Sequence, residues 1–223
     1  MLSSKVSMKT PLGLLPFVLL LTAGCVPLLR ADAPAVPAET ALALLKKTSA
    51  AFAASWESPS LPVAEARKAT SEGQHPIAVI VGCSDSRTPP EILFRKNLGR
   101  LFVVRTAGNV VDNVALGSIE YAVEHLGVRL VIVLGHTGCG AVKATVAGGH
   151  VPPHIASIVR KIRPAVQEAR KEKGNLLDNS IQANALRVAD TIRHDSAIPK
   201  DLSGLKVVPA IYDIKTGKVT WLE

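Results

Sequence analysis

The sequence predicts one α/β domain: a mainly parallel β-sheet flanked by helices, with an antiparallel edge strand at the C-terminal end. Three short apolar runs rich in Val and Ile, at 77–82, 100–105 and 130–135, lack the polar alternation of a half-exposed strand. Such runs are typical of parallel strands that are buried on both faces. Segments with helical spacing of apolar residues separate them, as the crossovers of a parallel sheet require. The chain has 223 residues, 48% of them hydrophobic, which is enough for one such core.

The first 38 residues are predicted to be a leader and tether. Lys5 and Lys9 precede an apolar run over 12–23, and no acidic residue occurs before Asp32. The run is interrupted by Gly and Pro and is too short to span a bilayer as a helix. Together these features are typical of a secretory signal, so we expect an exported, periplasmic protein.

Processing of this leader leaves two alternatives open. The sequence VPA ending at Ala38 suits a signal peptidase that needs small residues, whereas LTAGC ending at Cys25 resembles a lipoprotein cleavage box. The chain is expected to contact a membrane only if Cys25 is lipidated. A buried N-terminal helix is the remaining interpretation.

The predicted domain occupies residues 39–223. An Ala-rich amphipathic helix opens it, a connecting segment leads to the three strands, and a strand with a Thr-Gly turn closes it as an edge hairpin. We expect Pro164 to kink or divide the helix that contains it. The helices are expected at 40–55, 89–99, 114–127, from 139 onward, 155–173 and 175–194.

The formal net charge of +8 does not indicate a nucleic-acid partner. The basic residues scatter through helical stretches such as 160–174 and are not interleaved with aromatic residues. Such a stretch is interpreted as a solvated helix face, which leaves a mild attraction for small anions.

Metal-capable side chains follow two of the predicted strands. Cys83 comes directly after the strand over 77–82, His136 directly after the strand over 130–135, and Cys139 three residues later. Ligands bind outside the carboxyl ends of parallel strands, so neighbouring strands would bring these side chains to one centre. Two thiolates and one imidazole suit zinc, and we expect one ion per chain. A disulfide between Cys83 and Cys139, common in exported proteins, is the alternative.

Asp85 and Arg87 follow Cys83 at intervals of two residues. Three protein ligands leave a zinc ion a fourth position, which water or the Asp85 carboxylate can fill. The planar fork of Arg87 can hold that carboxylate ionised and away from the metal, ready to accept a hydrogen bond from zinc-bound water. The pattern therefore predicts an open, catalytic zinc site, with Asp85 as fourth ligand only in a closed state.

Four motifs together resemble a β-class carbonic anhydrase over about residues 40–223: CSDSRTPPEILF, FVVRTAGN, GSIEYAVEHLG and GHTGCGAV. The resemblance implies a catalytic domain that reversibly hydrates carbon dioxide to bicarbonate and a proton through zinc-bound hydroxide. It implies a homodimer, which can pair into a tetramer, with the N-terminal helix wrapped around the partner. The site residues that it implies are Cys83, His136 and Cys139 as zinc ligands, Asp85 and Arg87 as the catalytic pair, and Phe102, Ala107 and Tyr121 along the carbon dioxide pocket.

Two other functions fit the same ligand set. A sister hydrolase acting on COS or CS2 would use the same zinc ligands and would differ in the access tunnel. A non-catalytic zinc-binding protein would need neither Asp85 nor Arg87, so the presence of this pair argues against it.

Overall fold

The computed structural model of the chain describes residues 35–55, 61–198, 202 and 204–222. The predicted leader, with Cys25, lies outside the described residues except for 35–38. Among the helices described here, none combines the length and the apolar character needed to cross a bilayer.

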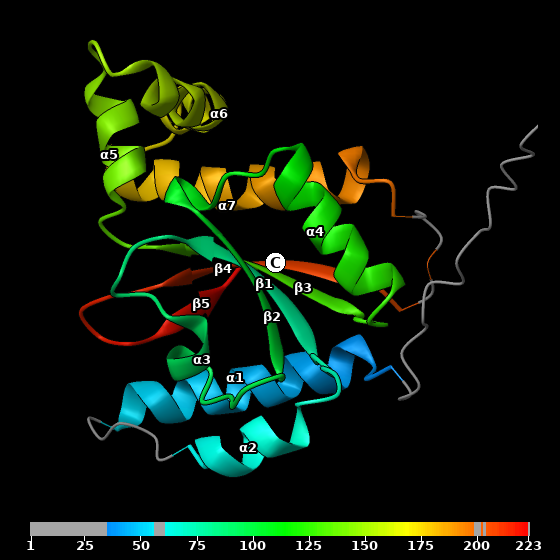
Figure 1. The fold of residues 1–223 in the computed structure, drawn as a ribbon. Helices are drawn as coiled ribbons and strands as arrows, with labels where there is room; N and C mark the ends of the chain where they lie inside the picture. Colours follow the sequence, from blue (N-terminus) through cyan, green and yellow to red (C-terminus); the bar gives the residue numbers. More distant parts are fainter. Residues whose placement is uncertain (1–34, 56–60, 199–201, 203, 223) are drawn as a thin grey trace, which may run out of the picture.

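Five strands form one sheet in the order β2-β1-β3-β4-β5 (Figure 1). The first four strands in this order run parallel and β5 pairs antiparallel with β4, which confirms the predicted fold class and the closing hairpin. All residues of β1 and β3 are buried, so neither strand needs polar alternation. The strand bounds are Ala78–Cys83 (β1), Leu101–Thr106 (β2), Leu130–His136 (β3), Lys206–Tyr212 (β4) and Val219–Trp221 (β5).

Helices cover both faces of the sheet (Figure 1). One face packs against α1, with α2 and α3 beside it, and the other against α4 and α7, with α5 and α6 beyond. Successive residues of β1 alternate between the two cores: Val79, Val81 and Cys83 face one, Ala78 and Ile80 the other. The helix bounds are Ala38–Ala54 (α1), Val63–Ala69 (α2), Pro90–Leu93 (α3), Asn113–Glu124 (α4), Gly140–Ala147 (α5), Pro153–Ala169 (α6) and Leu176–Asp195 (α7).

Two elements differ from the sequence prediction. The helix expected over 89–99 ends at Leu93, because the backbone turns left-handed at Arg95. The segment expected to be a connection contains the short helix α2. Pro164, expected to kink or divide its helix, lies inside α6, which continues on both sides of it and is therefore not divided. A kink at this residue stays a prediction.

The N-terminal helix α1 packs on the sheet of its own chain. Its buried residues Ala41 and Leu45 belong to the same core as Ile80 of the central strand. At its first turn, Glu39 forms an ion pair with Lys206 of β4. The apolar side of α1 is thus buried within its own chain. The prediction that α1 wraps around a second subunit can therefore concern only the exposed side of this helix.

Candidate metal centre

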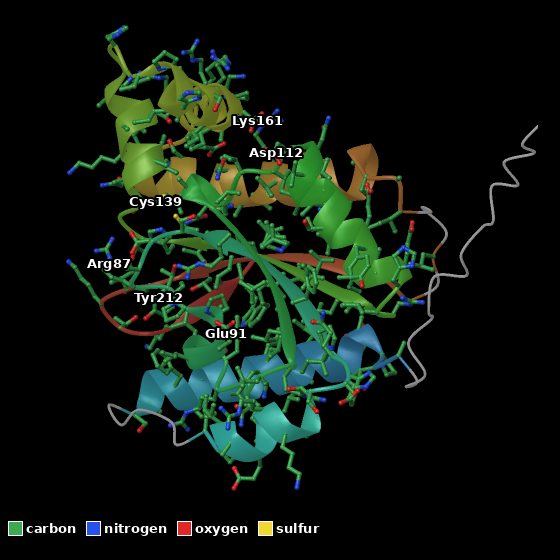
Figure 2. The ribbon with its side chains drawn as sticks, in the orientation of Figure 1. Arg87, Glu91, Asp112, Cys139, Lys161 and Tyr212 are labelled. Atoms are coloured by element: carbon green, nitrogen blue, oxygen red, sulfur yellow. The ribbon has the colours of Figure 1, made fainter. Side chains whose placement is uncertain are left out.

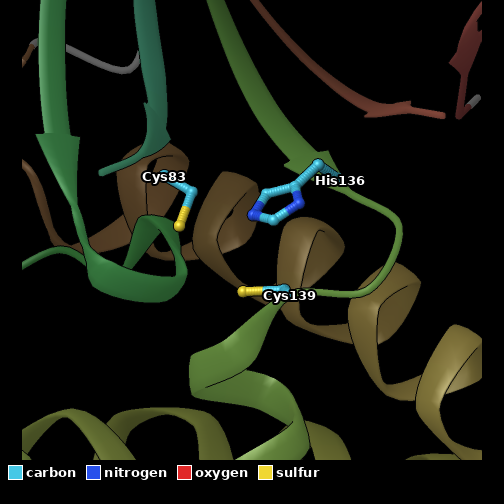
Figure 3. A group of neighbouring side chains, drawn as sticks. All are labelled: Cys83, His136 and Cys139. Carbon is cyan, nitrogen blue, oxygen red and sulfur yellow. The ribbon is translucent and has the colours of Figure 1, made fainter. Parts of the chain in front are cut away.

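Three potential metal ligands converge where the strand order reverses, between β1 and β3. Cys83 is the last residue of β1, His136 is the last residue of β3, and Cys139 directly precedes α5. The ligand atoms of these three side chains all lie within 4.8 Å of one another. Figure 3 shows the three side chains pointing toward a common centre. Because β1 and β3 are hydrogen-bonded neighbours, this is the arrangement predicted for their carboxyl ends. Cys83 and Cys139 are both free, so the alternative disulfide is not formed.

The three side chains are almost fully buried and their orientation is fixed by the backbone. Cys83, His136 and Cys139 are 6%, 1% and 2% exposed. The N–H of Gly108 donates to Cys83 Sγ over 3.2 Å, and His136 Nδ1 lies 3.1 Å from the carbonyl oxygen of Thr137. That bond requires the proton on Nδ1, which leaves the lone pair on Nε2. His136 Nε2 is buried and has no hydrogen-bond partner among the described residues, as expected of a metal ligand.

The pKa values of these three side chains are also consistent with the binding of a cation. Hydrogen bonds from Cys139 first, and then from His136 and Gly108, lower the pKa of Cys83 to about 3 against the opposing effect of burial. The same bond to Cys83, together with burial, raises the pKa of Cys139. Burial lowers the pKa of His136, but the hydrogen bond to Cys83 and its charge outweigh this and raise it. The group therefore shares protons that a divalent ion would displace, and two sulfurs with one imidazole nitrogen are the donors that zinc prefers.

Asp85 and Arg87 form a bidentate ion pair beside the three candidate ligands. Arg87 donates from Nε to Oδ1 over 2.9 Å and from Nη2 to Oδ2 over 2.7 Å, and its backbone N–H also donates to Oδ1. These bonds hold the pKa of Asp85 well below its usual range. Asp85 Oδ2 is 3.9 Å from His136 Nε2, so the carboxylate faces the metal-binding group while it is held by Arg87. Its role as a fourth ligand stays a prediction.

Two polar residues that support the site were not found from the sequence. Arg105 on β2 donates to the carbonyl oxygens of Cys83 and Asp85, over 2.8 and 2.5 Å, and so fixes the loop that carries both. Asn184 on α7, which is 2% exposed, donates to the carbonyl oxygen of Gly108 over 2.8 Å. No motif marks either residue, because each reaches the site from a distant part of the chain.

Gly108 fills a place where a side chain does not fit. Its φ is +70°, and an added Cβ would lie 2.7 Å from Ile162 Cδ1 and 3.1 Å from Ala141 Cβ. The left-handed backbone turn allows its N–H to point at Cys83 while its carbonyl faces Asn184.

The three residues predicted for the substrate pocket lie in two places. Ala107 starts the short 3-10 helix Ala107–Asn109 and precedes Gly108 at the metal-binding group. Phe102 lies on β2 about 13 Å before Thr106, the residue paired with Cys83. Tyr121 on α4 packs against Phe102, with ring centroids 6.3 Å apart. Within one chain only Ala107 adjoins the ligands, and the pocket role of all three stays a prediction.

Comparison with known proteins points to one family. A family model described as carbonic anhydrase matches residues 78–219. A carbonic anhydrase of Mycolicibacterium smegmatis is 41% identical over an alignment of 165 residues, with a coverage of 70% of this chain and 79% of that protein. Carbonic anhydrase 2 of Mycobacterium tuberculosis is 41% identical over 159 residues, covering 68% of this chain and 77% of that protein.

Solved structures give the same result. A Coccomyxa β-carbonic anhydrase, solved with acetazolamide, superposes with a TM-score of 0.65 at 27% identity and covers 71% of this chain and 77% of its own. A tetrameric β-carbonic anhydrase from Sordaria macrospora gives a TM-score of 0.62 at 25% identity and covers 68% and 83%.

Proposed function

Because this chain belongs to the β-class carbonic anhydrases, a family of lyases, we propose that it reversibly hydrates carbon dioxide to bicarbonate and a proton with one zinc ion per chain. The observation that carries the proposal is the convergence of Cys83, His136 and Cys139 within 4.8 Å, next to the Asp85–Arg87 pair. A site that only stabilised the fold would not need an ionised carboxylate beside it.

The zinc ion would be held by Cys83 Sγ, His136 Nε2 and Cys139 Sγ. Bound there, it supplies Lewis acidity and lowers the pKa of a coordinated water to about 7. The chain prepares this site in advance: the buried walls exclude bulk water, and the Gly108 N–H stabilises the charge of the Cys83 thiolate.

Asp85 and Arg87 orient the reacting water in this proposal. Both carboxylate oxygens already accept hydrogen bonds from Arg87, and the remaining lone pairs of Oδ2, on the side of His136, can accept one from a water in the site. An acceptor that stays ionised fixes the direction of the water's O–H bond and leaves the oxygen lone pair for the carbon of CO2. Arg105 fixes the Cys83–Asp85 loop against β2 through its hydrogen bonds to two carbonyl oxygens of this loop.

The test combines metal content with substrate choice. We expect about one zinc per chain by mass spectrometry of the intact native protein, and rapid CO2 hydration in a stopped-flow indicator assay. COS and CS2, assayed with the same preparation, should be hydrolysed far more slowly. Zinc-loaded protein that does not hydrate CO2, or that prefers a sulfur analogue, would refute the proposal.

We further propose that the chain acts as a homodimer. After Leu101 the residues of β2, an edge of the described sheet, are only half-buried. On α4, which contacts β2, Val114 and Tyr121 are 78% and 45% exposed, and a second copy would cover such apolar surface. Light scattering should give twice the chain mass, or four times if dimers pair, and Val114→Asp should shift the protein toward the monomer. A monomer at micromolar concentration would contradict this part.

Export to the periplasm is the last part of the proposal, and it rests on the leader in the sequence. Mass spectrometry of the mature protein distinguishes its forms: cleavage after Ala38, acylation at Cys25, or an intact N-terminus. The third result would contradict export.

A further inference from the structure

A cavity of 220 Å³ lies between α6, α7 and the loop that follows the 3-10 helix. Arg160 and Lys161 of α6 and Arg187 of α7 line it, and no carboxylate does. Figure 2 shows Lys161 on α6, on the same side of the sheet as Cys139. None of the three candidate metal ligands lines the cavity, which is bordered by three cations and is separate from the metal centre.

The positive charge at this cavity is largely uncompensated. Arg187 pairs with Glu168, which does not line the cavity, while neither Arg160 nor Lys161 forms an ion pair with any described residue. The segment 140–174 carries seven basic and two acidic residues, which is +5 of the chain's +8. Most of the chain's net positive charge therefore lies in the segment that contains α5 and α6.

We propose that this cavity binds a small oxyanion of the bicarbonate or phosphate type. Arg160 and Arg187 provide planar forks that match oxyanion geometry, and Lys161 adds a third positive charge. The volume admits one such anion with its nearest waters. Asn184, almost fully buried, completes the wall on the α7 side.

A cavity on the other flank of α6 provides a contrast within the molecule. It measures 290 Å³ and is lined by Arg163 and Arg170, but it also adjoins Gly148 at the C-terminal end of α5. The free carbonyls at a helix C-terminus carry partial negative charge, which disfavours an anion there. Basic side chains therefore line both cavities, three in the first and two in the second, while the backbone electrostatics of the two cavities differ.

A hydrogen-bond path connects the proposed anion site with the metal centre. Asn184 Nδ2 donates to the carbonyl oxygen of Gly108 over 2.8 Å, and the Gly108 N–H donates to Cys83 Sγ over 3.2 Å. An anion bound next to the Asn184 side chain would therefore perturb its hydrogen bond to Gly108 and change the environment of the Gly108 amide. Occupancy of the cavity would be sensed at a metal ligand without contact between the anion and the metal.

Nuclear magnetic resonance of the ¹⁵N-labelled native protein tests the proposal directly. Inorganic phosphate and bicarbonate are titrated separately, with chloride at matched ionic strength as the control for screening. At least one oxyanion should shift the Nε–H signals of Arg160 and Arg187 and the side-chain amide of Asn184 with a single saturable curve, and chloride should not. The Gly108 amide should follow the same curve. Only the bicarbonate arm assumes the proposed function, since the phosphate arm is independent of it.

Charge-neutralising variants then locate the site. The double variant Arg160→Gln/Lys161→Gln should weaken binding at least tenfold, whereas Arg163→Gln/Arg170→Gln, which removes the same charge from α6 and the residue that follows it, should change it less than twofold. If the first variant does not fold, the map of shifted signals in the unsubstituted protein decides alone. No saturable shift at Asn184 with either oxyanion, or an equal loss of binding in both variants, overturns the proposal.

Discussion

Gly108 connects Asn184 to the thiolate of Cys83, although these residues are far apart in the sequence. Its N–H donates to the sulfur over 3.2 Å and its carbonyl accepts from the Asn184 amide over 2.8 Å. One backbone residue thus joins a helix on one face of the sheet to a metal ligand at the end of the central strand. The local geometry of this glycine is therefore part of the metal centre.

Gly108→Ala should weaken both the fold and the metal site. The left-handed backbone alone costs an alanine about 1 kcal/mol, and the added Cβ would also clash with Ile162 and Ala141. We expect a loss of about 2–4 kcal/mol of unfolding free energy and zinc affinity lower by about 10-fold or more, measured by urea unfolding and competition with a chelator. Gly127→Ala is the matched control, because Gly127 has φ +69° and an added Cβ would meet only Ala35 Cβ at 3.7 Å, an ordinary van der Waals contact, so it should lose only the backbone contribution. Equal losses in the two variants would contradict this account of Gly108.

Asp85→Asn should lower kcat while zinc stays bound. Asparagine keeps the shape of the side chain but cannot remain an ionised acceptor beside the reacting water, and such acid-base contributions are worth about 10²–10⁴ in rate. Stopped-flow kinetics measures the loss and metal analysis shows that the ligands are intact. Hydration at the rate of the unsubstituted enzyme would exclude Asp85 from the mechanism.

The Asp85 carboxyl should remain ionised at a pH where an ordinary aspartate is half protonated. Hydrogen bonds from Arg87 hold the pKa of Asp85 far below its usual value of about 3.9. A depressed pKa in the folded state means that the pair's contribution to stability is fully present above about pH 4 and is lost as the pH falls toward the folded-state pKa. Carboxyl ¹³C signals followed from pH 7 to 3 should show no titration of Asp85, whereas in Arg87→Gln the pKa should rise toward its ordinary value. A midpoint near 4 in the unsubstituted protein would be inconsistent with the observed pair.

Removal of the metal should make one of the two site cysteines selectively reactive. Without a bound ion the pKa of Cys83 is lowered to about 3, while that of Cys139 is raised. At pH 5, iodoacetamide should therefore modify Cys83 before Cys139 in chelator-treated protein, as peptide mass spectrometry can measure. Zinc-loaded protein, the control, should protect both thiols. Preferential modification of Cys139 would reverse the assigned protonation order.

The convergence of the three candidate metal ligands was predictable because their spacing is local and the sheet rule is general. Cys83, His136 and Cys139 lie at or just after strand ends, and the ends of neighbouring parallel strands meet at one edge. Asp85 and Arg87 were found for the same reason, since both are within four residues of a ligand.

Supporting contacts were not predictable in the same way. Asn184 is 76 positions from Gly108, and no periodicity in α7 distinguishes its amide from a solvent-facing one. The strand pattern predicts only which face of the sheet the side chain of Arg105 lies on. It does not predict that this long side chain donates to the carbonyl oxygens of Cys83 and Asp85. The left-handed residue Arg95, which ends α3 early, likewise has no local sequence signal, because it is neither glycine nor asparagine.

The three ligands differ in how firmly the fold holds them. Cys83 and His136 end fully buried central strands, whereas Cys139 sits at the start of α5 in a layer that stands away from the sheet (Figure 1). Local fraying of that helix start would release one sulfur while the strands stay paired. Exchange of a bound ion would then need no global denaturation, and we expect the metal-free protein to stay folded and to take up the ion again.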